Sequence, residues 1–144
     1  MAVINDFAEN KLVDALLRGQ TINAPATYYM ALSTATRSDA GGPTEPTDPA
    51  YARAAVTPAV TSFSSTQGDT TVSSGTDGTV ENLTDIAWPT STAAWGEIKS
   101  VWFMDAATGG NAWISIDLTT PINVATTGFT LHFAPGALTF QIDN

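Results

Sequence analysis

The chain has 144 residues, with 14 acidic and 5 basic side chains, a formal net charge of −9 and no cysteine. Nucleic-acid binding needs clustered Lys and Arg, so this charge disfavours a nucleic-acid partner. The lack of cysteine excludes disulfides and thiolate metal sites. A hydrophobic content of 43% with 13% charged residues is enough for a core, and a single domain over residues 1–144 is predicted.

No apolar run approaches the roughly 20 residues that a membrane-spanning helix needs. The first ten residues, MAVINDFAEN, carry acidic side chains where a secretory signal would carry basic ones. We therefore expect a protein that is made in the cytoplasm and has no membrane partner.

An amphipathic helix is predicted over residues 5–18, because apolar residues recur there at spacings of three and four. Asn5 or Asp6 can cap its start, and Glu9 follows Asp6 by three residues, as in a capping box. Gly19 lies where helices commonly stop. The apolar stripe either packs on the chain's own sheet or docks on a neighbouring subunit, and both interpretations stay open. The side chains that would make partner contacts are Phe7, Leu12 and Leu16.

Residues 27–144 are predicted to form an antiparallel, jelly-roll-like β-sandwich of about seven or eight strands. Alternating or β-rich runs occupy residues 27–34, 51–60, 80–89, 98–104, 112–118, 129–134 and 138–142. A Pro135-Gly136 turn is expected to join the last two runs into a hairpin.

A tryptophan-rich hairpin is expected at the centre of this sandwich. The runs at 98–104 and 112–118 flank the turn DAATGGN, whose consecutive glycines suit positive φ. Buried aromatic side chains carry the largest apolar area per residue. The predicted core therefore consists of Trp88, Trp95, Trp102, Phe103, Trp113, Phe129, Phe133 and Phe140.

Two long loops interrupt the strand pattern. Residues 35–50 contain three prolines, two glycines and three acidic residues, and residues 61–79 are dominated by Ser, Thr and Gly. Loops of this length are contact arms or mobile insertions. Asp39, Glu45 and Asp48 are the candidate partner contacts on the first loop, and a long mobile hairpin or irregular excursion is expected for the second.

The residue types that catalysis requires are mostly missing. His132 is the only histidine, and its polar-face position favours a solvated or hydrogen-bonded structural role over that of a base. Most acidic residues fall in the helix or in turns, where they act as turn formers. The turn at 105–111 offers oxygen ligands without the regular spacing of a calcium loop, so calcium there stays open. No catalytic, cofactor-binding or metal residue is assigned, no cofactor is expected, and no enzymatic activity is predicted.

Several motifs follow one another in a characteristic order along most of the chain. They are the helix NDFAENKLVDALLRG, the strand APATYYMALSTA, the loop DAGGPTE, the strand YARAAV, and the segment AAWGEIKSVWFMDAATGGN followed by the turn LTTPINV. This order resembles a family of small virion proteins from tailed bacteriophages, described as tail-fibre-like or virion structural proteins.

The resemblance implies a non-enzymatic virion component, made in the host cytoplasm, that binds other copies of itself and other virion proteins. The chain has no extended repeat of the kind found in fibre shafts, so a capsid decoration or cement protein on the major capsid protein is the first expectation. A tail-fibre or baseplate-associated attachment protein is the alternative. A carbohydrate- or receptor-binding module that uses the tryptophans as stacking platforms, and an enzyme, are the remaining hypotheses.

Overall fold

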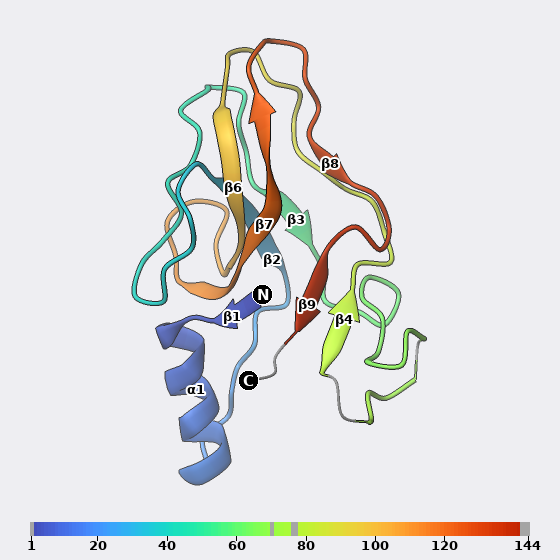
Figure 1. The fold of residues 1–144 in the computed structure, drawn as a ribbon. Helices are drawn as coiled ribbons and strands as arrows, with labels where there is room; N and C mark the ends of the chain where they lie inside the picture. Colours follow the sequence, from blue (N-terminus) through green and yellow to red (C-terminus); the bar gives the residue numbers. More distant parts are fainter. Residues whose placement is uncertain (1, 70, 76–77, 142–144) are drawn as a thin grey trace.

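A five-stranded antiparallel sheet forms the centre of the computed structural model, which describes residues 2–69, 71–75 and 78–141 (Figure 1). Its strands, in spatial order, are β1 (Ala2–Ile4), β7 (Ala112–Val124), β6 (Gly96–Met104), β2 (Tyr28–Ser33) and β3 (Ala54–Val56). Two two-stranded ribbons pair β4 (Thr79–Glu81) with β9 (Thr139–Gln141), and β5 (Ile86–Ala87) with β8 (His132–Phe133). The helix α1 (Asp6–Leu17) projects from one end. The expected class, mainly β with antiparallel sheets and one helix near the N-terminus, is confirmed.

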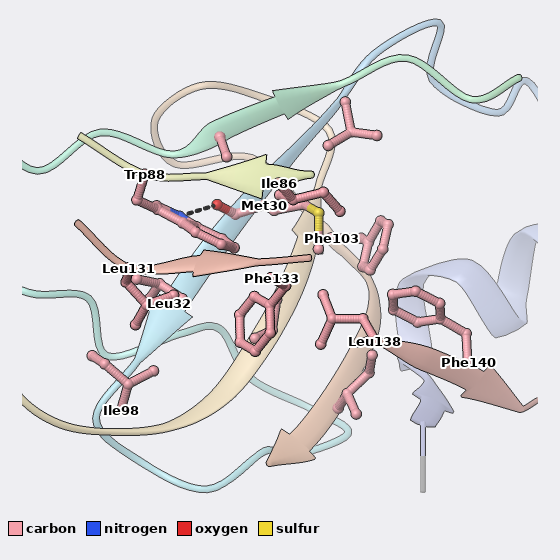
Figure 2. Packing of buried hydrophobic residues seen from close by; sticks show 14 of the residues in the cluster. Met30, Leu32, Ile86, Trp88, Ile98, Phe103, Leu131, Phe133, Leu138 and Phe140 are labelled. Carbon is pink, nitrogen blue, oxygen red and sulfur yellow. Dashed lines mark hydrogen bonds between the residues drawn. The ribbon is translucent and has the colours of Figure 1, made fainter. Parts of the chain in front are cut away.

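The main core lies between the sheet and the two ribbons. Alternate residues of β2 and β6, among them Met30 and Phe103, point toward Phe133 and Phe140 of the ribbons (Figure 2). The rings of Phe103 and Phe140 meet edge to face, with centroids 4.9 Å apart. The buried Trp88 indole donates its Nε1 hydrogen to the Met30 carbonyl at 2.9 Å, so this tryptophan brings no unpaired polar group into the core.

The other face of the sheet carries a smaller apolar cluster of Ala31, Trp102, Met104 and Ala112. Part of the loop at 35–50 is hydrogen-bonded to the sheet beside this cluster. The Ser33 hydroxyl accepts a hydrogen bond from the Thr44 amide at 3.0 Å, and the Ser100 hydroxyl donates to the Ala35 carbonyl at 2.8 Å. This loop is thus tied to its own sheet, although much of its outer side is exposed.

The β6–β7 hairpin forms as predicted. The Asp105 carboxylate closes its turn by accepting hydrogen bonds from the backbone amide of Asn111 at 2.7 Å and from its side-chain amide at 2.9 Å. Gly110 has a φ of 76°, and a Cβ atom there would lie 2.4 Å from an Asp105 carboxylate oxygen. Both the backbone conformation and the close approach therefore require glycine at this position.

The expected turn at residues 118–124 is wrong, because β7 continues through it to Val124. Ile98 pairs with Ile122, and Ser100 pairs with Asp117. Residues 118–121 therefore stand opposite Lys99 alone, in an irregular bulge. Pro121 lies in this bulge, where its missing N–H removes no regular ladder hydrogen bond.

The expected C-terminal hairpin is also wrong, because β8 and β9 pair with different strands. The buried Asn82 side chain lies between them. Its Nδ2 donates to the Ala134 carbonyl at 2.9 Å, and its Oδ1 accepts from the Leu138 amide at 2.9 Å. These bonds occupy backbone groups that a direct β8–β9 ladder would use. The turn itself remains, with the Ala137 amide donating to the Ala134 carbonyl at 3.0 Å.

Seven of the aromatic side chains expected in the core are buried: Trp88, Trp95, Trp102, Phe103, Trp113, Phe133 and Phe140. Phe129 is 40% exposed, so its assignment to the core is wrong. Its backbone is held outside the sheet by Ser91, whose hydroxyl accepts from the Phe129 amide at 3.1 Å and whose amide donates to the Phe129 carbonyl at 2.9 Å. The strand alternation therefore begins only after residue 129.

Trp102→Ala should lower the free energy of unfolding by about 3 to 5 kcal/mol, because it leaves a cavity under the second face of the sheet. It also removes the hydrogen bond from the indole Nε1 to the Ser100 hydroxyl, which measures 2.8 Å. Urea unfolding followed by circular dichroism measures the change. Val72→Ala at a side chain that is 91% exposed is the control and should shift stability by less than about 0.5 kcal/mol. A Trp102→Ala variant whose free energy of unfolding is nearly that of wild type would contradict this packing.

Candidate partner interface

The single histidine is part of a surface hydrogen bond. His132 Nδ1 lies 2.7 Å from the Asp85 carboxylate, and both side chains are about half exposed. Asp85 directly precedes β5 and His132 begins β8, so the contact joins the two strands of one ribbon. The sequence predicts a solvated or hydrogen-bonded histidine, and this histidine is hydrogen-bonded.

Acidic side chains do not gather into a metal site in the described part of the chain: no group of three or more His, Cys, Asp or Glu residues there is placed to hold an ion. The Asp105 carboxylate, one oxygen donor of the possible calcium turn, is occupied by Asn111. Burial, the largest single cause, acts to raise the pKa of Asp105, but the hydrogen bonds to its carboxylate, those from Asn111 first, together outweigh burial, and the pKa is lowered. Asp105 thus serves as the turn former.

Within residues 2–69, 71–75 and 78–141, no helix is long and apolar enough to cross a membrane. The four tryptophans are all buried. None of their rings therefore lies open on the surface as a stacking platform for a sugar.

The acidic residues of the 35–50 loop have three different environments. Asp39 is exposed, as a partner contact should be. Glu45 forms a salt bridge of 2.7 Å with the buried Arg53 side chain and accepts a hydrogen bond from the Tyr51 hydroxyl at 3.0 Å. Asp48 is only 6% exposed, so its assignment as a partner contact is wrong.

Asp48 is instead an internal hydrogen-bond acceptor. Its carboxylate accepts hydrogen bonds from the Thr92 amide at 2.7 Å, the Thr92 hydroxyl at 2.6 Å and the Trp95 indole at 2.8 Å. The amides of Ala50 and Ala93 donate at 3.0 Å each. These hydrogen bonds hold the pKa of Asp48 well below its ordinary value, and the one from the Thr92 hydroxyl has the largest effect. Burial opposes them, because it acts to raise the pKa.

Helix α1 packs on the sheet only at its start. The Phe7 ring meets Trp113 edge to face, with centroids 5.6 Å apart, and Ala8 is the buried residue of the helix. Asn5 precedes the helix, but its side chain makes no cap bond. It donates instead to the carbonyls of Ser38 and Asp39, at 2.8 and 3.2 Å. Asp6 is the first residue of the helix and not its cap, so the capping box predicted between Asp6 and Glu9 is wrong.

The second half of α1 is apolar and uncovered. Leu12 is half-buried, whereas Val13, Leu16 and Leu17 are 50%, 72% and 81% exposed. Ile22 in the following link is also exposed. We call Val13, Leu16 and Leu17 the helix patch. The sequence predicted Leu16 as a contact and missed Val13 and Leu17, although the pairs 12–13 and 16–17 already indicate an apolar stripe wider than one buried face requires.

An apolar hollow opens between the sheet and the β4–β9 ribbon, with a volume of about 240 Å³. Its lining comes from β2, β4, β6, β7, β9 and the segment before β4, and consists of Tyr28, Pro58, Phe63, Val80, Phe103, Ile114 and Phe140. Desolvation by burial, with a smaller effect of Asp105, raises the pKa of Tyr28. We call this site the apolar hollow. An open hollow without charged lining suits an apolar side chain of a partner.

Comparison with known protein families gives a match over most of the chain. The family model described as "Podophage GP4 fiber I protein gp80" matches residues 3–141. No curated protein matches the chain.

Asp48→Asn should destabilise the fold in a pH-dependent way. Because the folded-state pKa is lowered, the carboxylate adds stability above about pH 4, the pKa of an unfolded Asp. That contribution is lost as the pH falls through the folded-state value. We expect a lower urea midpoint than wild type at pH 7 and a smaller difference near pH 3. Asp39→Asn is the control at an exposed carboxylate, and an Asp48→Asn difference that is equal at both pH values would contradict this account.

Proposed function

We propose a role in fibre assembly for this chain, which belongs to the podophage GP4 fiber I protein gp80 family and is a structural protein of the phage virion. In this role it is built into, or attached to, the fibre of the particle and holds virion proteins together. The match over residues 3–141 is the observation that carries the proposal, because it spans nearly the whole chain of 144 residues.

The use of polar groups in the fold supports an assembly role. The carboxylates of Asp48 and Asp105 and the amide of Asn82 are taken up by internal hydrogen bonds. The Arg53 guanidinium is likewise bound to Glu45. The molecule also exposes two apolar surfaces, the helix patch and the apolar hollow, and exposed apolar surface marks protein contacts.

The family description favours the tail-fibre alternative over the capsid decoration that the compact, repeat-free sequence suggested. A compact β-fold with a projecting helix suits a joint or an end of a fibre, because neither position requires the repeated sequence of a shaft. The partners that follow from this proposal are tail or baseplate proteins, together with further copies of the chain.

Labelling of intact particles tests the proposed location. Fab fragments raised against the purified protein should decorate the fibres when labelled virions are imaged by electron microscopy. Particles from a phage with a stop codon early in this gene are the control and should carry no label. Label spread over the capsid faces would contradict the fibre assignment and favour a decoration protein.

A further inference from the structure

We infer that a pocket at the start of α1 receives an arginine side chain of another virion protein. The inference rests on the proposed function, because fibre assembly requires contacts with other virion proteins. It adds the chemistry of one such contact.

The pocket lies between the start of α1, the loop at 35–50 and the β6–β7 turn, and its volume is about 350 Å³. Ligand pockets in proteins begin at about 300 Å³, so the space accommodates one long side chain. The lining includes Asn5, Asp6, Phe7, Asp39, Met104 and Ala112. We call it the acidic pocket, because its lining residues in the described part of the chain include two carboxylates and no Lys or Arg.

The carboxylates of Asp6 and Asp39 are available to a ligand. Both residues are exposed. Within residues 2–69, 71–75 and 78–141, neither carboxylate has a hydrogen bond or a salt bridge. Asp48 and Asp105, in contrast, are occupied by internal donors. The acidic pocket therefore presents two unpaired negative charges, which favour a cationic ligand.

The side chain of Asn5 gives a second, independent observation. Asn5 is 1% exposed, and its Nδ2 donates to the carbonyls of Ser38 and Asp39, which fixes the orientation of the amide. Its Oδ1 is buried and has no hydrogen-bond partner among the described residues. An acceptor buried in this way is costly unless a donor reaches it. The wall of the pocket thus favours a ligand that carries N–H groups.

An arginine side chain matches this lining. Its guanidinium carries five N–H donors in one plane, which suits several acceptors at once. Its apolar stem can lie along Phe7, Met104 and Ala112. The partial positive charge of the helix N-terminus opposes a cation, but the carboxylates of Asp6 and Glu9 in the first turn counter it.

The basic side chains of this chain are already engaged, so a second copy is a poor source of the arginine. Each of the five lies against a carboxylate or a ring of its own molecule. The pairs are Lys11 with Phe7, Arg18 with Asp14, Arg37 with Asp117, Arg53 with Glu45 and Lys99 with Glu97. A second copy would have to give up one of these contacts, and its net charge of −9 would repel the first copy. A different protein with an unpaired arginine has neither cost.

Titration of the full chain with N-acetyl-arginine amide, followed by nuclear magnetic resonance, tests the ligand chemistry. The backbone amide signals of Gly41, Gly42 and Asn111, which line the pocket, should shift until the site is saturated. The citrulline analogue, which is neutral and has a similar shape, should bind about 10-fold more weakly or worse, because the charge-assisted hydrogen bonds are lost. The lysine analogue should also bind more weakly, since one ammonium does not offer the planar set of donors.

Three results of this titration would overturn the inference. The first is the lack of any saturable shift, and the second is equal binding of the citrulline analogue. The third is a lysine analogue that binds as tightly as the arginine probe, because the pocket would then not select arginine.

Removal of the two carboxylates tests the site. Asp6→Asn with Asp39→Asn should raise the dissociation constant of the arginine probe by about 10-fold or more. Both side chains are exposed, so circular dichroism should report an unchanged fold. Glu81→Gln with Glu97→Gln is the matched control, because it removes the same two charges outside the pocket, and it should leave the dissociation constant nearly unchanged. An equal effect of the two double variants would mean that only net charge matters, which would contradict the site.

Incorporation into particles tests the partner. A phage with a stop codon early in this gene, complemented by the double Asn variant, should yield particles with several-fold less of the protein than complementation by the control variant, as measured by immunoblot. Equal incorporation would overturn the role of the pocket in assembly. These results are separate from the Fab labelling. Labelled fibres without arginine binding would leave the proposed function standing alone, and arginine binding with capsid labelling would leave only the pocket.

Discussion

The hydrogen bonds accepted by the Asp48 carboxylate hold together parts of the fold that are far apart in sequence. Asp48 belongs to a long loop, and its donors at Thr92, Ala93 and Trp95 lie just before β6. Without this acceptor the buried Trp95 indole would lose its partner, and an unpaired buried N–H is costly. A single ionised side chain thus fixes the loop and places a core tryptophan, and charge-assisted bonds are strong enough for that task.

A second polar cluster ties the same loop to the hairpin at the centre of the sheet. The Arg53 guanidinium binds Glu45 on one side and donates to the carbonyls of Ala106 and Gly109 on the other, at 2.6 and 2.8 Å. The Tyr51 hydroxyl connects Glu45 to the backbone of β2 by accepting from the Leu32 amide at 2.8 Å. Since buried ion pairs add orientation more reliably than stability, this cluster explains why a proline-rich loop with an exposed outer side follows one path. It also explains why the Glu45 carboxylate, which already accepts hydrogen bonds from Tyr51 and Arg53, has little capacity left to bind a partner protein.

Local patterns in the sequence predicted the elements whose causes are local. The glycines after Asp105 and the flanking β-branched runs are enough to specify the β6–β7 hairpin, and Gly19, with a φ of 67°, follows the last turn of α1 as expected. The predictions are wrong where a residue distant in sequence determines which strands pair or whether a side chain is buried. Asn82 separates β8 from β9, and Ser91 holds the backbone of Phe129 outside the sheet. Neither partner can be identified from strand alternation, because alternation describes one strand at a time.

The same distinction explains what could be foreseen of the candidate interface. Leu16 stands out in the sequence because it belongs to a wide helical stripe, but the fold is needed to show that the packing on the sheet reaches only Phe7 and Ala8 at the start of the helix. The apolar hollow has no sequence signature, since residues as distant as Tyr28 and Phe140 form its wall. An acidic chain that leaves both surfaces open avoids non-specific association through its net charge. It can then reserve apolar contact for a partner whose shape fits the helix patch or the apolar hollow.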